Sequence, residues 1–275
     1  MRKLKLSAFI ERIYSMQRII SLFFVVFLLS GLHSYSQNDE AIIDNKLTRC
    51  SQQLLLQVKR KEPADSFIRV LQQISPTSLA SELNTDTKKK AFWLNIYNAF
   101  TQLFLSQHPD QYKKRAQFFG AKRIIIAGQK LSLDRIEHGL LRRSATKWSL
   151  GYIRRLFPSS FEKQHRVDTV DFRIHFALNC GAKSCPPIAF YQVEQLDRQL
   201  NLATKIYLKS EAEYNAEKKS IALPAIMGWF RADFGGKRKM KELLRENGVI
   251  PKESDPSISF KKYDWNLYLD NYKTD

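Results

Sequence analysis

The sequence lacks the features that usually divide a chain into parts. It contains no internal repeat and no low-complexity tract, and after residue 36 it has no second long hydrophobic run. Its nine prolines are scattered along the chain, so they form no linker. We therefore expect residues 37–275, about 239 in number, to form one compact unit, with a helical region at 37–79 followed by a single domain at 80–275.

The long apolar run lies near the N-terminus and indicates export. It extends from Leu22 to Leu29, which is shorter than the roughly 20 residues that a membrane-spanning helix needs. Ser34 and Ser36 then occupy the positions that a signal peptidase reads, and polar residues follow. We expect a signal peptide at 1–36, with Met16 as a second candidate start, and a mature chain in the periplasm or outside the cell. An uncleaved membrane anchor is the alternative.

The chain is basic, with a formal net charge of +18 that falls to about +14 once residues 1–36 are removed. Such a charge favours anionic partners, for example a phospholipid surface or an acidic polysaccharide. The basic clusters are not interleaved with aromatic residues, as a stacking platform for nucleic acid would be. We therefore expect no nucleic acid partner, an unknown envelope ligand or protein, and a monomer.

Apolar periodicity predicts an α+β fold. The central element is a helix from Lys88 to Ser106 that is apolar nearly all round and begins after the capping residues Thr85 to Thr87, so we expect it to be enclosed. We expect this buried helix to pack on a small antiparallel sheet and to be surrounded by further helices. Other predicted elements are two helical stretches within 40–75, a hairpin at 123–133, a helix from Ser132 or Asp134 through Arg143, a strand at 171–179, a helix at 193–209, a strand at 218–223, short helices at 226–230 and 240–246, and a strand at 258–263.

The segment 173–187 carries the strongest signal for chemistry. The predicted strand places His175 on its polar face and leads into a loop with Cys180 and Cys185. A histidine within reach of a thiol can act as its base, so Cys180 is a candidate nucleophile. The two cysteines also fit a disulfide in an oxidising compartment, a zinc site of unfamiliar spacing, or two ordinary buried thiols. Cys50 is expected to be a core residue.

Two further groups of polar residues fall on predicted helices. Asn95 and Asn98 share one face of the enclosed helix, where their amides either bond neighbouring backbone or orient a catalytic imidazole or oxyanion. Glu137 lies on an apolar stripe, so we expect it to be partly buried with Arg142 or Arg173 as its cation partner.

Several of these segments together resemble the domain-of-unknown-function family 547. They are 91–99, 131–142, 175–187 and 263–267, and the resemblance spans roughly residues 80 to 270. This family implies no established biochemical activity. A weaker resemblance to the papain and transglutaminase group would pair a nucleophile on the buried helix with His175. Between Lys88 and Leu105 there is no cysteine or serine, so on that analogy the site is degenerate or uses Cys180.

The leading hypothesis is a polar pocket formed by Asn95, Asn98, Glu137, His175 and Cys180. As an enzyme, it would be a thiol hydrolase or an acyltransferase that needs no cofactor and no metal. The alternatives are a non-catalytic module that binds an envelope ligand or protein, and a structural protein held by a disulfide between Cys180 and Cys185.

Overall fold

The computed structural model describes residues 45–273. The chain divides into two compact units, Met1–Lys46 and Leu47–Asp275, of which the second carries almost all of the described residues. The predicted signal peptide at 1–36 lies outside the described part of the chain. In that described part, no helix is both long and apolar enough to cross a bilayer.

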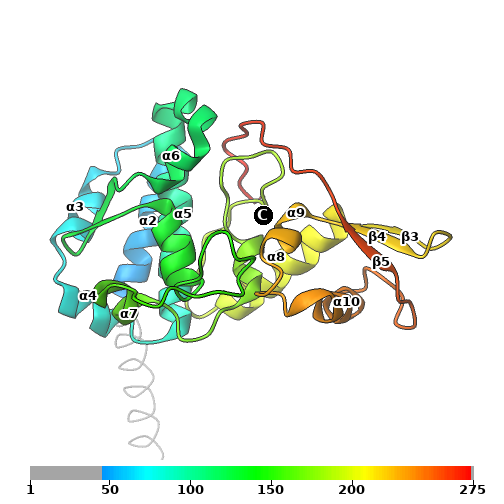
Figure 1. Ribbon diagram of the computed structural model, residues 1–275. Helices are drawn as coiled ribbons and strands as arrows, with labels where there is room; N and C mark the ends of the chain where they lie inside the picture. Colours follow the sequence, from blue (N-terminus) through cyan, green and yellow to red (C-terminus); the bar gives the residue numbers. More distant parts are fainter. Residues whose placement is uncertain (1–44, 274–275) are drawn as a thin grey trace, which may run out of the picture. The chain divides into compact units, whose positions relative to one another are not determined.

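Helices come first along the chain and most strands gather towards its end (Figure 1). The helices are α2 (Lys46–Arg60), α3 (Asp65–Gln73), α4 (Pro76–Glu82), α5 (Asp86–Gln107), α6 (Arg115–Gly120), α7 (Ser160–His165), α8 (Leu196–Glu211), α9 (Ala225–Trp229) and α10 (Gly236–Glu246). The described residues also form three helical segments of other types, η1 (Pro109–Lys114), η2 (Arg135–Leu141) and η3 (Phe172–Phe176). The strands are β1 (Ile124–Ile126), β2 (Gln129–Leu131), β3 (Glu213–Asn215), β4 (Ser220–Leu223) and β5 (Ser257–Phe260). β1 pairs antiparallel with β2, β3 pairs antiparallel with β4, and β5 joins β4 in parallel. The predicted α+β class is confirmed.

The buried helix of the prediction is α5. Its side chains are buried along most of its length, including Trp93 and Tyr97. Thr85 caps its first turn, because its hydroxyl accepts a hydrogen bond from the backbone N–H of Lys88. Full burial of each large apolar side chain contributes roughly 1.5–3 kcal/mol, so a helix enclosed in this way anchors the surrounding elements.

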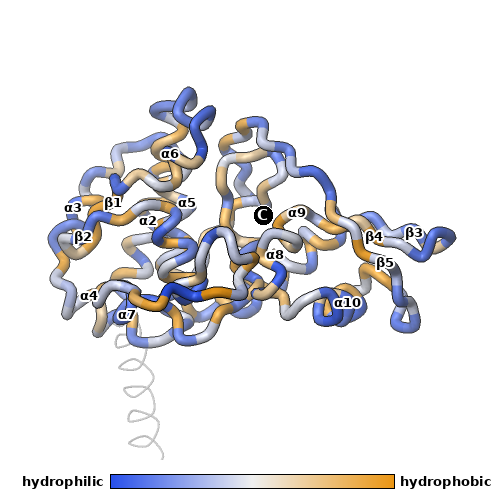
Figure 2. The backbone as a smooth tube through the Cα atoms, viewed as in Figure 1, coloured by the Kyte–Doolittle hydropathy of each residue, from blue (hydrophilic) through white to orange (hydrophobic). Residues whose placement is uncertain are grey.

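The apolar side chains form two clusters. The first surrounds α5 and includes residues of α2, α3, the β1–β2 hairpin and the segment 177–191. The second joins α8, α9, α10 and the strands β4 and β5, which lie together in Figure 1. Figure 2 shows mostly hydrophilic residues along α10 and at the turn between β3 and β4. Tyr263 packs against both clusters.

The predicted strand at 171–179 is wrong. Residues Phe172–Phe176 form the 3₁₀ helix η3, whose first turn is capped by the Asp171 carboxylate, since it accepts a hydrogen bond from the backbone N–H of Arg173. The alternating pattern misled because the polar member His175 is buried along with its neighbours. The rings of Phe172, His175 and Phe176 all pack around Phe234, at 5.4–5.6 Å between centroids.

The predicted helix near 132–143 exists but has a wider turn. In η2 the backbone N–H of Arg142 donates to the carbonyl of Glu137, five residues back, and Ser144 repeats this spacing with Gly139. Such π-type turns are rare in proteins, and those that occur often lie at functional sites. Here the wide turn carries Glu137 and His138, which both line the pocket described below.

Candidate functional site

A pocket of about 270 Å³ lies where the two apolar clusters meet. Ligand sites occur preferentially at the interfaces between packed units of a protein. The titratable and nucleophilic side chains that line it are Asp134, Glu137, His138, Lys147, His175 and Cys180. Its aromatic walls are Tyr97, Phe119, Trp229, Phe230, Tyr263 and Trp265.

His175 is held in one orientation by a buried carboxylate. Its Nε2 lies 2.8 Å from Oδ2 of Asp233, and its ring stacks on Phe230 with 4.0 Å between centroids. Arg142 binds both oxygens of Asp233, with Nε 2.6 Å from the same Oδ2 and Nη2 3.3 Å from Oδ1, and its guanidinium lies 4.4 Å above the Phe230 ring. Burial raises the pKa of Asp233, but the hydrogen bonds from His175 and Arg142 outweigh it and lower this pKa to about 2.

These contacts assign the proton on His175. Because Asp233 is ionised and only accepts, Nε2 of His175 carries the hydrogen and donates it. Burial lowers the pKa of His175 more than Asp233 raises it, so the imidazole is neutral and its Nδ1 keeps a lone pair. No hydrogen bond from another described residue occupies Nδ1. His175 therefore has the form that a general base needs.

His138 is neutral for a related reason. Nη1 of Arg142 lies 3.0 Å from its Nδ1, and a guanidinium only donates, so Nδ1 accepts. Burial, with the charge of Arg142, lowers the pKa of His138 to about 3. Glu137 accepts a hydrogen bond from Tyr97 Oη at 3.3 Å and lies 3.7 Å from His138 Nδ1. The predicted partnership of Glu137 with Arg142 or Arg173 is wrong, because Arg142 pairs with Asp233 and Arg173 pairs with Asp171.

The buried histidines predict a loss of stability in mild acid. Burial lowers the pKa of His138 to about 3 and of His165 to about 4, below the value of about 6.5 in an unfolded chain. Below pH 6.5 these histidines are protonated in the unfolded chain but stay neutral in the folded chain. The free energy of unfolding therefore falls as the pH falls. We expect a decrease of about 1.4 kcal/mol per pH unit for each such histidine between about pH 6 and 4.5. Urea unfolding at several pH values measures this slope. The slope should be smaller in His138→Gln, and an unchanged slope would show that His138 does not resist protonation.

Cys180 and Cys185 form a close thiol pair beside the pocket. Their Sγ atoms are 2.7 Å apart, and Tyr263 Oη lies 3.3 Å from the first and 3.1 Å from the second. The hydrogen bond with Cys185 lowers the pKa of Cys180 against the effect of burial, and Tyr263 adds to this lowering. Burial raises the pKa of Cys185. Either sulfur can be the donor between the two, and the backbone N–H of Cys180 also donates to Sγ of Cys185 at 3.0 Å.

Both cysteines are thiols in this structure. Their proximity is compatible with the predicted disulfide, which stays a prediction. Among the described residues, no group of three His, Cys, Asp or Glu side chains is arranged to hold a metal ion. Cys50 lies far from the pair and packs against the first cluster, with its Sγ 3.9 Å from the carbonyl of Phe67.

Asn95 and Asn98 do not line the pocket, and their catalytic role stays a prediction. Asn95 binds both backbone groups of Tyr191, donating to its carbonyl and accepting from its N–H at 2.9 Å each. Asn98 donates to the carbonyl of Ala177 at 3.0 Å and accepts from the N–H of Asn179 at 2.9 Å. Each amide fastens a loop to α5, as buried polar groups normally do. Asn98 contributes to the site indirectly, because the backbone it holds leads from η3 to Cys180.

The structure therefore brings together Glu137, His175 and Cys180 from the predicted set. It adds Asp233, which the sequence did not single out, together with the aromatic residues of the wall. Trp229 and Trp265 stack at 5.5 Å between centroids, and Tyr263 packs 4.6 Å from Trp265. A motif at 263–267 rich in aromatics was the available signal for this wall, whereas nothing near Asp233 in the sequence indicates a partner for His175.

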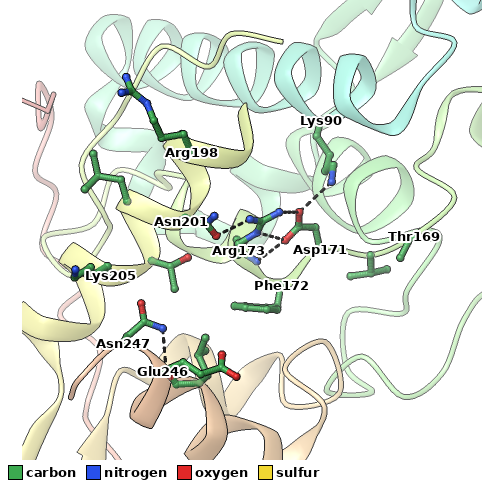
Figure 3. Close-up of a pocket in the computed structure, with 14 residues that line it drawn as sticks. Lys90, Thr169, Asp171, Phe172, Arg173, Arg198, Asn201, Lys205, Glu246 and Asn247 are labelled. Atoms are coloured by element: carbon green, nitrogen blue, oxygen red, sulfur yellow. Dashed lines mark hydrogen bonds and ion pairs between the residues drawn. The ribbon is translucent and has the colours of Figure 1, made fainter. Parts of the chain in front are cut away.

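A larger cavity of about 740 Å³ lies beside α8 and η3 (Figure 3). Its central charges satisfy one another, since Lys90 Nζ is 3.0 Å from Asp171 Oδ2 and Arg173 lies 2.8 Å from Asp171 and 2.6 Å from Asn201. Figure 3 shows these side chains pointing towards each other. Among the described residues that line it there is no cysteine or histidine. The smaller pocket is thus the better candidate for chemistry.

Comparison with known proteins adds a family but no activity. Residues 80–208 match the family model described as "Protein of unknown function, DUF547". This segment carries Glu137, His175, Cys180 and Cys185, while Asp233 and the aromatic motif at 263–267 lie beyond its end. No curated protein and no solved structure matches the chain, so the weaker resemblance to the papain and transglutaminase group stays a prediction. The predicted family is confirmed as a match over residues 80–208, which resemble DUF547, a family of proteins of unknown function.

Proposed function

We propose that the pocket is the active site of a cysteine-dependent acyl-transfer enzyme, either a hydrolase or a transferase. One observation carries the proposal: a thiol whose pKa is lowered and a neutral imidazole oriented by a carboxylate line the same cavity. Nucleophile, base and orienting group are the three parts that such chemistry requires. In this assignment they are Cys180, His175 and Asp233.

The reaction would proceed in two halves. First, Sγ of Cys180 forms a bond to the acyl carbon, the bond from that carbon to its oxygen or nitrogen leaving group breaks, and the leaving group takes the thiol proton. Second, Nδ1 of His175 removes a proton from water or another acceptor, whose oxygen or nitrogen attacks the thioester carbon. The bond from that carbon to Sγ then breaks, and the proton on Nδ1 passes to Sγ, which restores the thiol and the neutral imidazole. The aromatic walls favour an apolar or aromatic acyl group.

Trapping the acyl-enzyme tests this proposal. The reduced full chain is incubated with p-nitrophenyl acetate, and intact mass with peptide mapping locates any added acetyl group. We expect one acetyl group on Cys180 in the wild type and in Cys50→Ala, and none in Cys180→Ala. Acetylation spread over lysines, with Cys180 unmodified, would contradict the proposal.

A non-catalytic binding module is the second candidate. It is favoured by the contacts of Cys180, whose thiol bonds Cys185 and Tyr263 and has no imidazole among its hydrogen-bond partners in the described chain. A pocket that binds an apolar ligand without acyl-enzyme formation, under any ester tested, would support this candidate.

We further propose that the chain acts outside the cytoplasm, in the cell envelope or beyond it. The support is the apolar run at 22–29 followed by the small residues Ser34 and Ser36. N-terminal sequencing of the chain recovered from cells tests this, with Gln37 expected first and a retained Met1 or Met16 as the contrary result.

A further inference from the structure

We propose that the loop formed by residues 145–157 docks the protein on a bilayer that contains anionic phospholipid. This 145–157 loop connects η2 to α7 and is held at its base by backbone hydrogen bonds. Thr146 N–H donates to the carbonyl of Ile153 at 2.9 Å, and Arg155 N–H donates to that of Ser144 at 2.8 Å. The inference does not depend on the acyl-transfer chemistry.

The first observation is an unusual density of exposed apolar side chains. Among the described residues, half of the twelve exposed large hydrophobic side chains fall within positions 148–157. Phe157, Leu156 and Trp148 are 92%, 85% and 75% exposed, and Leu150, Tyr152 and Ile153 complete the set. Figure 2 shows the segment that leads into α7 passing from orange to blue and back to orange. Contiguous exposed apolar groups of this kind mark an interaction surface.

The second observation is a group of arginines beside these side chains. Among the described residues, Arg143, Arg154 and Arg166 have no carboxylate within ion-pair distance, whereas Lys147 and Arg155 pair with Asp134 and Glu162. Arg154 instead donates to the carbonyl of Arg143 at 2.8 Å, and Arg166 donates to Ser144 Oγ at 2.8 Å. Burial lowers the pKa of Arg154, and the positive charges of Arg143, Arg166 and Arg142 lower it further. The charge of Asp233 raises this pKa but does not outweigh them. The three cations repel one another, and an anion placed against them would relieve this repulsion.

Apolar and aromatic side chains next to arginines are complementary to one surface in particular. Trp and Tyr prefer the boundary between lipid headgroups and acyl chains, apolar side chains enter the acyl region, and arginines bind phosphate. A small free anion would leave the apolar side chains in water. The formal net charge of about +14 that remains after residues 1–36 are removed adds a long-range attraction to an anionic surface.

The 145–157 loop also abuts the candidate site. Lys147 lines the pocket, and the carbonyl of Leu150 accepts a hydrogen bond from Ala232 N–H at 3.0 Å, next to Asp233. Gly151 has φ +94°, and a Cβ there would lie 2.9 Å from Arg142 Nη2. Glycine thus lets the loop pass directly over the Arg142–Asp233 pair. A loop docked on a membrane would place the pocket close to the bilayer.

Vesicle flotation of the full chain tests this proposal. Vesicles of phosphatidylcholine alone are compared with vesicles that contain about 30 mol% phosphatidylglycerol. We expect binding to the anionic vesicles, a blue shift of tryptophan fluorescence that disappears in Trp148→Phe, and weaker binding at high salt. The triple variants W148S/L156S/F157S and R143Q/R154Q/R166Q should each bind about tenfold more weakly or worse.

Two matched variants distinguish binding through the 145–157 loop from nonspecific binding through exposed apolar side chains or net charge. V70S/L202S/I206S removes three exposed apolar side chains elsewhere, and K237Q/R238Q/K239Q removes three positive charges from α10. Both should bind within about twofold of the wild type. If the α10 variant loses as much vesicle affinity as R143Q/R154Q/R166Q, net charge alone explains the binding and the proposal is overturned. Absence of vesicle binding, with or without capture of a protein partner, would also overturn it. If the arginine triple variant fails to fold, Arg154→Gln alone is compared with Arg238→Gln.

Discussion

Replacing Asp233 with alanine should lower the free energy of unfolding by about 3–5 kcal/mol. The carboxylate is the shared partner of Arg142 and His175, at 2.6 Å and 2.8 Å. The Arg142 side chain has no exposed surface, so its charge cannot turn to water once the carboxylate is gone. A buried cation left without its counter-ion is among the most costly defects that a single substitution can produce.

Urea unfolding at pH 7 measures this effect, and Asp197→Ala is its control. Asp197 also forms a close pair, with Arg173 at 2.6 Å, but it is 79% exposed, so its loss should cost at most about 1 kcal/mol. Asp233→Asn should fall between the two, because the amide keeps its shape and one acceptor but loses its charge. Equal effects of the two alanine variants would show that the Arg142–Asp233 pair is not protected from solvent.

Local patterns in the sequence were sufficient to predict most helices. The apolar character of 88–106, with Thr85 before it, predicts a capped and enclosed helix, and α5 is one. The apolar runs on either side of Gly128 predict the hairpin at 123–133 that β1 and β2 form, with Ala127 and Gly128 as its turn. In each of these cases the residues that determine the element lie within the element or next to it, so the pattern can be recognised without tertiary contacts.

The errors occur where distant residues decide the structure. Alternation at 171–179 predicts a strand only if the polar positions face solvent, yet His175 is buried because Asp233, 58 positions later, satisfies its Nε2. For Asn95 and Asn98 the sequence favours a structural role over a catalytic one but does not identify their partners. Their partners are backbone groups of Tyr191, Ala177 and Asn179, at sequence separations of about 80 to 96. Such pairings depend on the tertiary fold, which no local pattern encodes.

Replacing His175 with glutamine should reduce turnover of an activated ester by about 10²–10⁴-fold while leaving the fold intact. The glutamine amide can still donate a hydrogen bond to Asp233, so the buried carboxylate keeps both partners. It has no basic lone pair equivalent to Nδ1, so it cannot remove a proton from the incoming acceptor. Formation of the acyl-enzyme at Cys180 should be affected less than its breakdown, because the hydrogen bond with Cys185 already favours the thiolate. The variant should therefore accumulate the thioester.

One measurement and one control variant show whether the accumulation of the thioester depends on His175. Single-turnover kinetics with intact mass follows the thioester, and His165→Gln provides the same substitution at a buried histidine that does not line the pocket. The control should keep wild-type turnover, since His165 touches the core through Phe161 and through its carbonyl, which accepts from Trp93 Nε1. Normal turnover in His175→Gln would remove the imidazole from the mechanism. The remaining candidates for the chemistry of this site would then be the Cys180–Cys185 thiol pair and His138, which also lines the pocket.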